Sequence, residues 1–456
     1  MKVRTKLENE LRRREFWEFC IFYNPTFFTE REFLKEIADG FQQIHTGQIR
    51  RLAVSMPPRS GKSYLTSLYS AWLLGNNPEG SVMRNCATGR LYNIFSYHIR
   101  KIVRSEKFRE IFPGIELSKD KQNLEGWNLQ DAKMTSYFGA GVGGQIVGMG
   151  ATIVAITDDL IRGLEDSMSE TIIEKTSDWY DSDHMSRLEK GCPQIDIGTR
   201  WSKRDPIGRN IDNDFYDLII NKPALNENDE SISEAVNTAD YFMERRRTLA
   251  PEVWESMYQQ NPIEASGTLF KRSEAKRFSM FEMQKKINEG LKPETICACI
   301  DVADKGTDKY AHIIGFVFPN QVLIWDVIYS IDTIDITLPR TIEITQRYNV
   351  DNTVIEVNNQ GGEIVRGFRD KITFGNNFPI TNTINKHSRI LNNYGFSKDY
   401  FYFRQDSEIE KHSEYEKFMS EYFSYVKAGE NTKDDANDVG AGLAKFLGTR
   451  FRHLFT

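Results

Sequence analysis

A lysine and a serine stand side by side in a glycine-containing loop near the start of the chain. Residues 55–66 read SMPPRSGKSYLT and follow the apolar run RLAV. In a phosphate-binding loop, backbone N–H groups at a helix N-terminus surround phosphate oxygens, a lysine reaches the β- and γ-phosphates, and the next hydroxyl binds Mg²⁺. Lys62 and Ser63 have the residue types for these roles, and Gly61 allows a close backbone approach. The usual spacing, G-x-x-x-x-G-K-[ST], requires a glycine where this chain has Met56.

Two adjacent aspartates follow a second apolar run. In ATIVAITDDL, Asp158 and Asp159 end a stretch that is typical of a buried strand. One carboxylate of such a pair can hold the Mg²⁺ shell, and its neighbour can orient or deprotonate an attacking water. A turn or a helix cap is the alternative for two acids at a strand end. The lysine-containing loop upstream favours a site that hydrolyses nucleotides.

A second set of carboxylates lies in the C-terminal half. Hydrolysis of a phosphodiester by two metal ions needs three or four carboxylates from different elements. The candidates are Asp301, Asp304, Asp308, Glu356, Asp434, Asp435 and Asp438. Asp301 and Glu356 lie in largely apolar strands, where an unpaired carboxylate is costly, whereas the others could be turn residues or could stabilise the first turn of a helix. On that helix, residues 434 and 438, or 435 and 438, can share a face. We predict a site for Mg²⁺ or Mn²⁺.

The elements that must position these residues fall into two patterns. From about residue 50 to 220, strand-like runs alternate with helical ones; the strands are expected in RLAVSM, ATIVAIT and PQIDIGTRW, and a helix in YLTSLYSAWLLG. This alternation predicts an α/β domain with a mostly parallel sheet, whose working loops lie at the carboxyl ends of the strands. Residues 221–240 are polar and acidic and are expected to form a linker or lid, followed by one helical segment, ERRRTLAPEVWESMYQQ.

We place the domain boundary near residue 265, which gives domains of 1–265, with the linker or lid from about 221, and 266–456. After the boundary, TICACIDVAD, AHIIGFVFP and QVLIWDVIYSI are three strands in quick succession. A helix in TLPRTIEITQRYN, a strand in NTVIEV and a late helix in KDDANDVGAGLAKFL follow. This order predicts a mixed sheet flanked by helices.

Composition excludes several classes of protein. With 456 residues the chain is expected to form more than one domain. No apolar run could span a bilayer and the N-terminus is too charged for a signal-peptide core, so we expect an intracellular protein without a membrane anchor. Five scattered cysteines and seven histidines, without CxxC or HxxxH spacing, argue against disulfides and zinc. With a net charge of −6, contact with DNA requires local basic surfaces, and the candidates, each of which could instead be a solvated helix face, are Arg50-Arg51, residues 90–109, Arg245 to Arg247 and residues 271–277.

Residues 25–215 resemble the ATPase domain of bacteriophage large terminases, the motors that move DNA into procapsids. In that family the phosphate loop commonly reads PPR-x-GKS, without the first glycine, and residues 57–63 match it residue for residue. AWLLGNNPEG, FPGIEL, FGAGVGGQIVGMGA, the aspartate pair and GTRW, followed by Asp205 and Gly208-Arg209, also occur in the family's order.

The resemblance implies a RecA/ASCE-type P-loop domain that binds ATP and Mg²⁺. Its phosphate loop would comprise Pro58, Arg59, Ser60, Gly61, Lys62 and Ser63. Lys62 and Asp159 would be catalytic, and Asp158 would serve Mg²⁺ together with Ser63. Arg59 would contact phosphate charge and could act as an internal arginine finger.

The resemblance also implies that Thr199-Arg200 couple hydrolysis to movement. Many relatives carry an arginine near residue 150 that is a candidate finger for the neighbouring subunit, and this chain has Met149 there. The possible substitutes are Arg162, Arg200 and Arg204.

The C-terminal half resembles an RNase H-like nuclease, the second domain of large terminases, in its order of strand-Asp, hairpin strands, helix, strand-Glu and late helix-Asp. EVWESMYQQNPIEASGTLF is similar to the segment that joins the two domains in that family. The resemblance implies that Asp301, Glu356 and one or more of Asp434, Asp435 and Asp438 bind metal, with Asp308 a further candidate. In NKHSRI, Lys386 and Arg389 match a basic motif that could face DNA or be plain surface.

Together these resemblances imply a packaging motor that hydrolyses ATP to translocate double-stranded DNA and cuts concatemers with a metal-dependent endonuclease. The implied partners are DNA, a small terminase subunit and the portal protein, with a homo-oligomeric ring on the portal, in the host cytoplasm and transiently at the portal vertex. A repair-type ATPase–nuclease or helicase without a capsid partner is one alternative, and a nucleotide-dependent structural switch that cuts nothing is another.

Overall fold

The computed structural model of the chain describes residues 2–122, 126–146, 148–263, 267–302, 309–357, 366–368, 370–382, 384–427, 431 and 434–455. The chain divides into two compact units. The first unit comprises Met1–Arg245 and Pro251–Glu264, and the second comprises Arg246–Ala250 and Ala265–Thr456. The chain therefore enters the second unit, returns briefly to the first and leaves it again. Among the helices of the described ranges, none is both long and apolar enough to cross a membrane.

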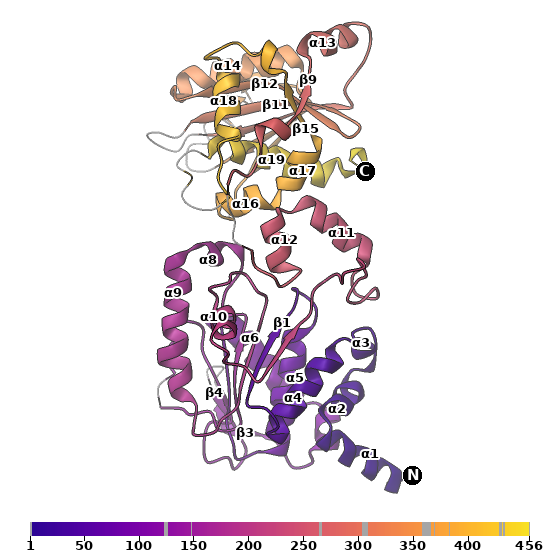
Figure 1. The fold of residues 1–456 in the computed structure, drawn as a ribbon, viewed down its shortest axis with the longest axis vertical. Coiled ribbons are helices and arrows are strands. Elements are labelled where there is room, and N and C mark those ends of the chain that lie inside the picture. The colour runs from indigo at the N-terminus through magenta and orange to yellow at the C-terminus, as the bar shows by residue number, and fades with distance from the viewer. Residues whose placement is uncertain are drawn as a thin grey trace. The chain divides into compact units, whose positions relative to one another are not determined.

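An eight-stranded sheet forms the centre of the first unit, in the order β3-β4-β5-β2-β6-β7-β1-β8 (Figure 1). Its strands are β1 (Arg51–Ser55), β2 (Val82–Cys86), β3 (Leu117–Gln122), β4 (Gly126–Leu129), β5 (Tyr137–Phe138), β6 (Val154–Asp158), β7 (Gln194–Gly198) and β8 (Leu218–Asn221). Neighbours are parallel from β5 to β8 and antiparallel between β3, β4 and β5. Every residue of β2, β6 and β7 is buried, as expected for parallel strands covered on both faces.

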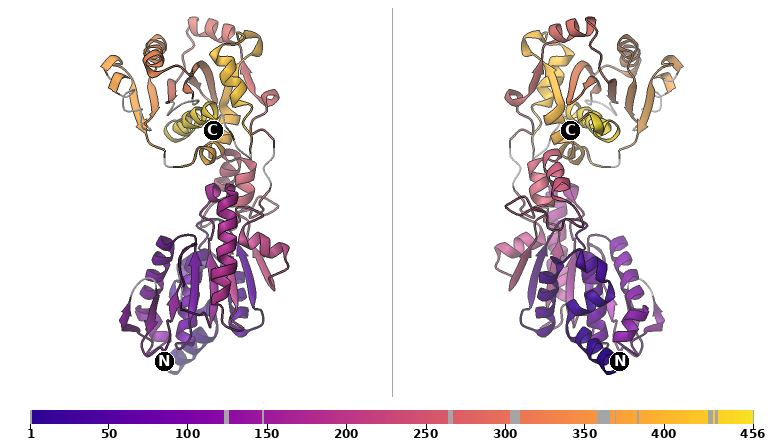
Figure 2. Two further views of the ribbon diagram at one scale, coloured as in Figure 1. Left: turned by 90° about the vertical axis from the view of Figure 1, so that its left-hand side faces the viewer. Right: turned by 90° about the vertical axis from the view of Figure 1, so that its right-hand side faces the viewer.

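Helices lie on both sides of this sheet (Figure 2). The helices of the first unit are α1 (Lys2–Arg14), α2 (Phe16–Tyr23), α3 (Pro25–Thr29), α4 (Leu34–Thr46), α5 (Lys62–Asn76), α6 (Gly89–Val103), α7 (Glu106–Ile111), α8 (Leu164–Met168), α9 (Glu170–Trp179), α10 (Pro206–Asp212) and α12 (Pro251–Met257), and α11 (Ala239–Thr248) begins in this unit and ends in the second. The segment predicted as one helix over residues 244–260 is two helices, α11 and α12. Pro251 begins α12, and a proline disfavours helical backbone at the residue before it, so the first helix ends upstream.

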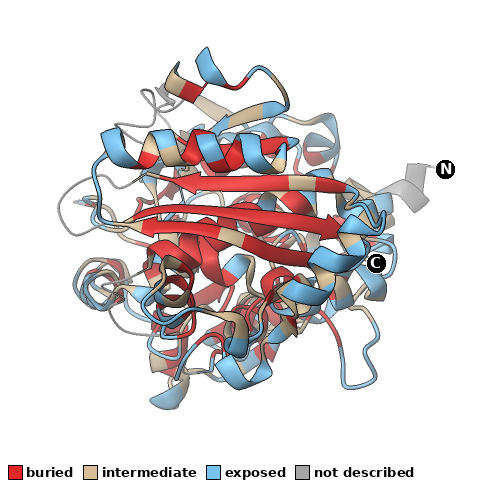
Figure 3. Ribbon diagram, turned by 90° about the horizontal axis from the view of Figure 1, so that it is seen from above, coloured by how far each residue is buried: buried red, intermediate tan, exposed pale blue. Residues whose placement is uncertain are grey.

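The second unit is built on a seven-stranded mixed sheet, in the order β14-β13-β10-β11-β12-β15-β9. Its strands are β9 (Lys276–Phe278), β10 (Thr295–Asp301), β11 (Tyr310–Phe318), β12 (Gln321–Ser330), β13 (Asn352–Glu356), β14 (Asn376–Ile380) and β15 (Phe401–Arg404). β10, β11 and β12 are antiparallel neighbours, and β13 lies parallel to β10. The central strands are buried over most of their length (Figure 3).

The helices that accompany this sheet include α13 (Met280–Asn288), α14 (Ile334–Tyr348), α16 (Lys386–Asn392), α17 (Tyr394–Tyr400), α18 (Glu414–Tyr422) and α19 (Asp435–Arg450). The late helix α19 packs against β10 and β11 and is buried over most of its first ten residues, which explains its small residues Gly440, Ala441 and Gly442. The predicted α/β class, with a mostly parallel first sheet and a mixed second sheet, is confirmed.

Candidate nucleotide and metal sites

The loop between β1 and α5 has the backbone of a phosphate-binding loop. Arg59 and Gly61 have φ angles of 62° and 106°, and α5 begins at Lys62, so the chain turns sharply into a helix N-terminus. Met56, at the position of the absent glycine, continues the ladder of β1. Its N–H donates to the carbonyl of Gly198 at 3.1 Å, and its side chain is fully buried. Met56 is therefore a residue of the hydrophobic core, and the residues after it form the turn.

The carboxyl ends of β1, β6 and β7 bring five of the predicted residues together. The ammonium of Lys62 lies 3.1 Å from Oδ2 of Asp159 and donates to Oγ1 of Thr199 at 3.1 Å. The N–H of Thr199 donates to Oδ1 of Asp159 at 2.9 Å. The hydroxyl of Ser63 donates to Oδ1 of Asp158 at 3.2 Å. Lysine, hydroxyls and both aspartates thus form one connected cluster beside the loop.

Arg84 completes this cluster, although the sequence did not point to it. It lies in β2, is fully buried and forms an ion pair with Asp158. Its guanidinium also donates to Oγ of Ser67 at 2.8 Å and to the carbonyl of Ser63 at 3.1 Å, and it lies 3.9 Å from the centre of the Phe95 ring. Burial by itself lowers the pKa of Arg84, but the charge of Asp158, its hydrogen bond with Arg84 and the nearby Tyr137 together leave that pKa raised.

Asp159 has the properties of a carboxylate that can take a proton. Burial raises its pKa, the ammonium of Lys62 opposes that rise, and the neighbouring charge of Asp158 adds to it. The side chain keeps 26% of its surface exposed, so water can reach it. Its φ angle of 53° lies in the left-handed region, which non-glycine residues adopt rarely and which often marks functional positions.

Three arginines considered as fingers each have a carboxylate partner. The ion pairs are Arg162 with Asp166 at 2.6 Å, Arg200 with Asp205 at 3.1 Å and Arg204 with Glu170 at 3.0 Å. Arg200 is buried, whereas the side chains of Arg162 and Arg204 are 60% and 64% exposed. Arg59 is exposed and makes no ion pair within the described residues. Met149 packs beside a hydrophobic cluster of the first unit.

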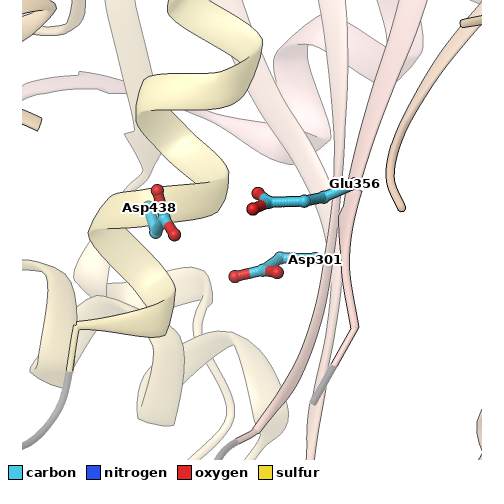
Figure 4. Close-up of side chains that lie close together, drawn as sticks. All are labelled: Asp301, Glu356 and Asp438. Carbon is cyan, nitrogen blue, oxygen red and sulfur yellow. The ribbon is translucent and has the colours of Figure 1, made fainter. Parts of the chain in front are cut away.

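Asp301, Glu356 and Asp438 form a buried triad in the second unit. Each offers a carboxylate oxygen, and these oxygens lie within 4.8 Å of one another. Asp301 ends β10 and Glu356 ends the parallel neighbour β13, so their side chains leave the same edge of the sheet (Figure 4). Asp438 faces them from the first turns of α19 (Figure 4). Oxygen ligands from three elements suit Mg²⁺ or Mn²⁺.

Two cations lie among these acids. Nε of Arg389 donates to Asp438 at 2.7 Å, and its Nη2 lies 3.6 Å from Glu356. The ammonium of Lys386 lies 3.2 Å from Asp434, 3.2 Å from Asp435 and 3.7 Å from Asp438. Arg389 is buried, so the alternative that it is a plain surface residue does not hold. The side chains of Lys386 and Arg389 both point at carboxylates.

The pKa values of two acids in the triad are raised, first of all by burial. Burial, with the charges of Asp438 and Glu356, raises the pKa of Asp301 well above its usual range. Burial raises the pKa of Asp438 to about 6, against the opposing hydrogen bond from Arg389. A bound divalent cation would stabilise the ionised form of carboxylates whose pKa is raised in this way.

The remaining predicted acids divide into two groups. Asp434 and Asp435 lie on the Lys386 side of the cluster, and Oδ2 of Asp435 also accepts the N–H of Lys309 at 3.0 Å. Asp304 and Asp308 fall outside the described residues. Of the three aspartates at the start of α19, the structure brings Asp438 into the triad with Asp301 and Glu356.

Comparison with known proteins identifies the fold of the chain. No protein-family model matches the chain, and no curated protein sequence matches it. Among solved structures, it is similar to the large terminase of a thermophilic bacteriophage in complex with ATP-gamma-S, with a TM-score of 0.50 and 10% identity over 89% of this chain and 95% of that one. The complex of the same terminase with ADP gives the same values. The chain has the fold of a phage large terminase. The HK97 large terminase is also matched, with a TM-score of 0.35 and 10% identity over 89% of this chain and 94% of that one.

Two features of the sequence give signals for basic residues of these sites that the motifs leave out. A single arginine inside the five-residue strand VMRNC, now β2, must be paired if the strand is buried, and Arg84 is that arginine. The spacing of Lys386 and Arg389 puts both on one helix face, which is compatible with one shared acidic target. Neither signal names the partner, because the partner lies on another element.

Proposed function

We propose that this chain is the motor subunit of a viral DNA-packaging machine. ATP hydrolysis in the first unit drives double-stranded DNA into a procapsid, and a metal-dependent endonuclease in the second unit cuts concatemers at initiation and termination. The observation that carries this proposal is the presence, on one chain with the fold of large terminases, of a lysine–aspartate–threonine cluster beside a phosphate loop and a buried carboxylate triad. The ATP-gamma-S and ADP bound to the terminase of the thermophilic bacteriophage support a nucleotide as ligand.

In the nucleotide site, Lys62 has two alternative sets of partners. In the structure, its ammonium contacts Asp159 and Thr199. With ATP on the loop from Pro58 to Ser63, its ammonium would turn to phosphate oxygens. That exchange removes the cation that lowers the pKa of Asp159, so the carboxylate becomes a stronger base for the attacking water.

The other residues of the cluster hold charge in place. Ser63 and Asp158 would hold the Mg²⁺ that accompanies ATP, which neutralises phosphate charge. Arg84, in an ion pair with Asp158, holds that carboxylate in place. Arg59, exposed within the loop, would stabilise the charge that develops on the transferred phosphoryl group. Thr199 and Arg200 would couple hydrolysis to movement, since Thr199 touches both Lys62 and Asp159.

In the nuclease site, the residues present fit a divalent metal. The donor atoms are carboxylate oxygens, and the cluster holds more acids than cations, so a bound ion would relieve repulsion that now raises the pKa of Asp301. Asp301, Glu356 and Asp438 would hold Mg²⁺ or Mn²⁺, while Asp434 and Asp435 pair with Lys386, which also faces Asp438. When bound, the metal activates water and stabilises charge on the phosphate. Arg389 orients Asp438 and Glu356.

The same proposal implies partners. Double-stranded DNA is the substrate of both activities, and a small terminase subunit and the portal protein would bring the chain to DNA and capsid in the host cytoplasm. A homo-oligomeric ring would form on the portal. In such a ring, Arg162 and Arg204 are exposed enough to reach a neighbouring subunit after exchanging their carboxylate partners.

In vitro packaging with procapsids tests the proposal. Lys62→Ala is expected to abolish packaging and DNA-stimulated ATP hydrolysis while plasmid nicking in Mn²⁺ persists, and Asp301→Asn is expected to abolish nicking while hydrolysis persists. A repair-type ATPase–nuclease or helicase would show both activities in the parent and no packaging. A structural switch would bind nucleotide and nick nothing. Either result contradicts the packaging motor.

A further inference from the structure

Gln260 joins the turn after β7 to helix α12. Its Oε1 accepts the N–H of Arg200 at 3.0 Å, and its Nε2 donates to the carbonyl of Met257 at 2.7 Å. The residue is 2% exposed; its hydrogen bond with Arg200 is buried, and the one with Met257 is partly buried. Its φ angle is 58°, a left-handed conformation that glutamine adopts rarely and that persists only where the surroundings hold it. One side chain thus fixes two segments that lie far apart in the sequence.

The turn that Gln260 holds is the one that touches the nucleotide cluster. Thr199 immediately precedes Arg200, and its N–H donates to Asp159 at 2.9 Å. Its hydroxyl accepts from Lys62 at 3.1 Å and donates to the carbonyl of Met56 at 3.1 Å. A continuous chain of hydrogen bonds therefore runs from Lys62 and Asp159 through residues 199–200 to Gln260 and the end of α12.

Helix α12 has an unusual place in the chain. Pro251–Glu264 belongs to the first unit, yet the residues just before it, Arg246–Ala250, and the residues from Ala265 onward belong to the second. Val253 and Trp254 are buried, and the carbonyl of Tyr258 accepts the N–H of Ala224 at 2.8 Å, so the helix is docked within the first unit. A displacement of α12 is therefore passed along the covalent chain at both of its ends.

We propose that Gln260 is a positioning residue for ATP hydrolysis and that it transmits the position of the Thr199-Arg200 turn to α12. When Lys62 leaves Thr199 for a phosphate, the turn loses one of its anchors, and Gln260 makes α12 follow the turn. This inference rests on the proposed ATPase function. It adds a residue that the phosphate loop and the aspartate pair do not predict.

Three variants of the full-length chain separate the two contacts of Gln260. Gln260→Met keeps the length of the side chain and removes both hydrogen bonds. Gln260→Glu keeps an oxygen for the N–H of Arg200 but faces the carbonyl of Met257 with an acceptor. Gln259→Met is the matched control, because Gln259 is partly buried and makes no side-chain hydrogen bond within the described residues. Thermal unfolding of each variant checks that it is folded.

The readouts are kcat and KM for ATP, and DNA packaged per ATP hydrolysed. Gln260→Met is expected to lower kcat about tenfold, the loss typical when a buried N–H loses its acceptor, with KM for ATP changed by less than about twofold. Gln260→Glu is expected to keep kcat within about threefold of the parent while packaging per ATP falls about tenfold, because one of the two hydrogen bonds is retained.

Each result bears on one of the two proposals. If Gln260→Met matches Gln259→Met in kcat and in packaging per ATP, Gln260 has no positioning role. If Gln260→Met does not fold, Gln260→Glu decides, and parent-like packaging per ATP in that variant overturns the inference. If the parent itself hydrolyses no ATP, the proposed ATPase function fails, and this inference fails with it.

Discussion

The two candidate sites differ in their balance of charge. In the first unit, each aspartate has one cation, Asp158 with Arg84 and Asp159 with Lys62. In the second unit, the acids are Asp301, Glu356, Asp434, Asp435 and Asp438, and the cations are Lys386 and Arg389. The first cluster is neutral when all groups are ionised, and the second is strongly negative. Each cluster has two cations and at least one carboxylate at a strand end, so the difference comes from the additional acids of the second cluster, three of which lie at the start of α19.

This difference in charge matches the ligand that each site is proposed to bind. A nucleotide arrives with its own Mg²⁺ and needs a preformed lysine, so a neutral cluster can accept it without binding metal first. DNA is a polyanion, and a negative cluster repels it until metal ions are bound. Burial and the charges of Asp438 and Glu356 raise the pKa of Asp301, and burial raises the pKa of Asp438 to about 6, whereas in the first site Lys62 and Arg84 offset the charges of Asp159 and Asp158.

The largest expected effect separates the two activities. Lys62→Ala should lower DNA-stimulated ATP hydrolysis by at least about a thousandfold, since it removes the cation that faces the phosphates. Asp301→Asn should lower plasmid nicking in Mn²⁺ by a similar factor, since it removes a shared metal ligand. Each variant should keep the other activity within about threefold of the parent, because the residues lie in different units. Loss of both activities in either variant would contradict the assignment of one chemistry to each unit.

Arg84→Met tests whether the first cluster depends on its protein cation. The change leaves Asp158 fully buried with no positive partner, and we expect the first unit to lose about 3 kcal/mol of unfolding free energy. Native-state hydrogen exchange of amides in β6 and β7 measures this loss in the first unit alone.

Arg389→Met is the matched change in the second cluster. There, a divalent ion can replace the missing charge, so Mn²⁺ should restore most of the lost stability of the second unit. Mn²⁺ should restore less of the loss in Arg84→Met, where Asp158 alone loses its cation and Lys62 remains beside Asp159. If Mn²⁺ restored the stability of both variants equally, or of neither, the two sites would not differ in whether protein cations or metal ions balance their negative charge.

The parts of these sites that follow local rules could be predicted from sequence. β1, β6 and β7 end in polar residues, and the carboxyl ends of parallel strands meet, so Lys62, Asp158 and Thr199 could be expected at one edge. Arg84 could not, because its pairing with Asp158 follows from the register of β2 against β6, which no local pattern specifies. The same limit applies to Gln260, whose two hydrogen bonds connect separate elements.

In the second unit, the limit is the rotation of one helix. Three aspartates at the start of α19 share compatible spacings, and sequence alone leaves the choice among them open. Packing of the buried small residues after them against β10 and β11 fixes the rotation and turns Asp438 toward the strands. The buried ion pair of Arg389 with Asp438 was not predicted for a similar reason, since a basic residue on a short helix is compatible with DNA contact or with plain surface until its buried acidic partner is known.

Metal binding by the parent gives a smaller but direct test of the comparison. Without nucleotide, Mn²⁺ at a hundred times its dissociation constant should stabilise the second unit by about 2.7 kcal/mol and leave the first unit unchanged. Calorimetry with and without EDTA measures the total effect, and hydrogen exchange of β10 and β13 assigns it to the second unit. Asp438→Asn should weaken this stabilisation. Stabilisation of β6 and β7 by Mn²⁺ alone would show that the first cluster also needs metal.

The smallest expected effect concerns a feature that the two units share. Burial lowers the pKa of His184 to about 4 and that of His312 to about 3, so both rings are neutral in the folded chain. An unfolded histidine has a pKa of about 6.5 and binds more protons as the pH falls, so stability present above that pH is lost toward the folded pKa. As the pH falls from 7.5 to 5.5, each histidine should lower the unfolding free energy of its unit by about 1 kcal/mol. His184→Gln should flatten this slope for amides of β6 and β7 only, and His312→Gln for amides of β11 only. A slope that stays unchanged in both variants would mean that other groups set the acid response, and the two units would then differ in charge balance without sharing this histidine effect.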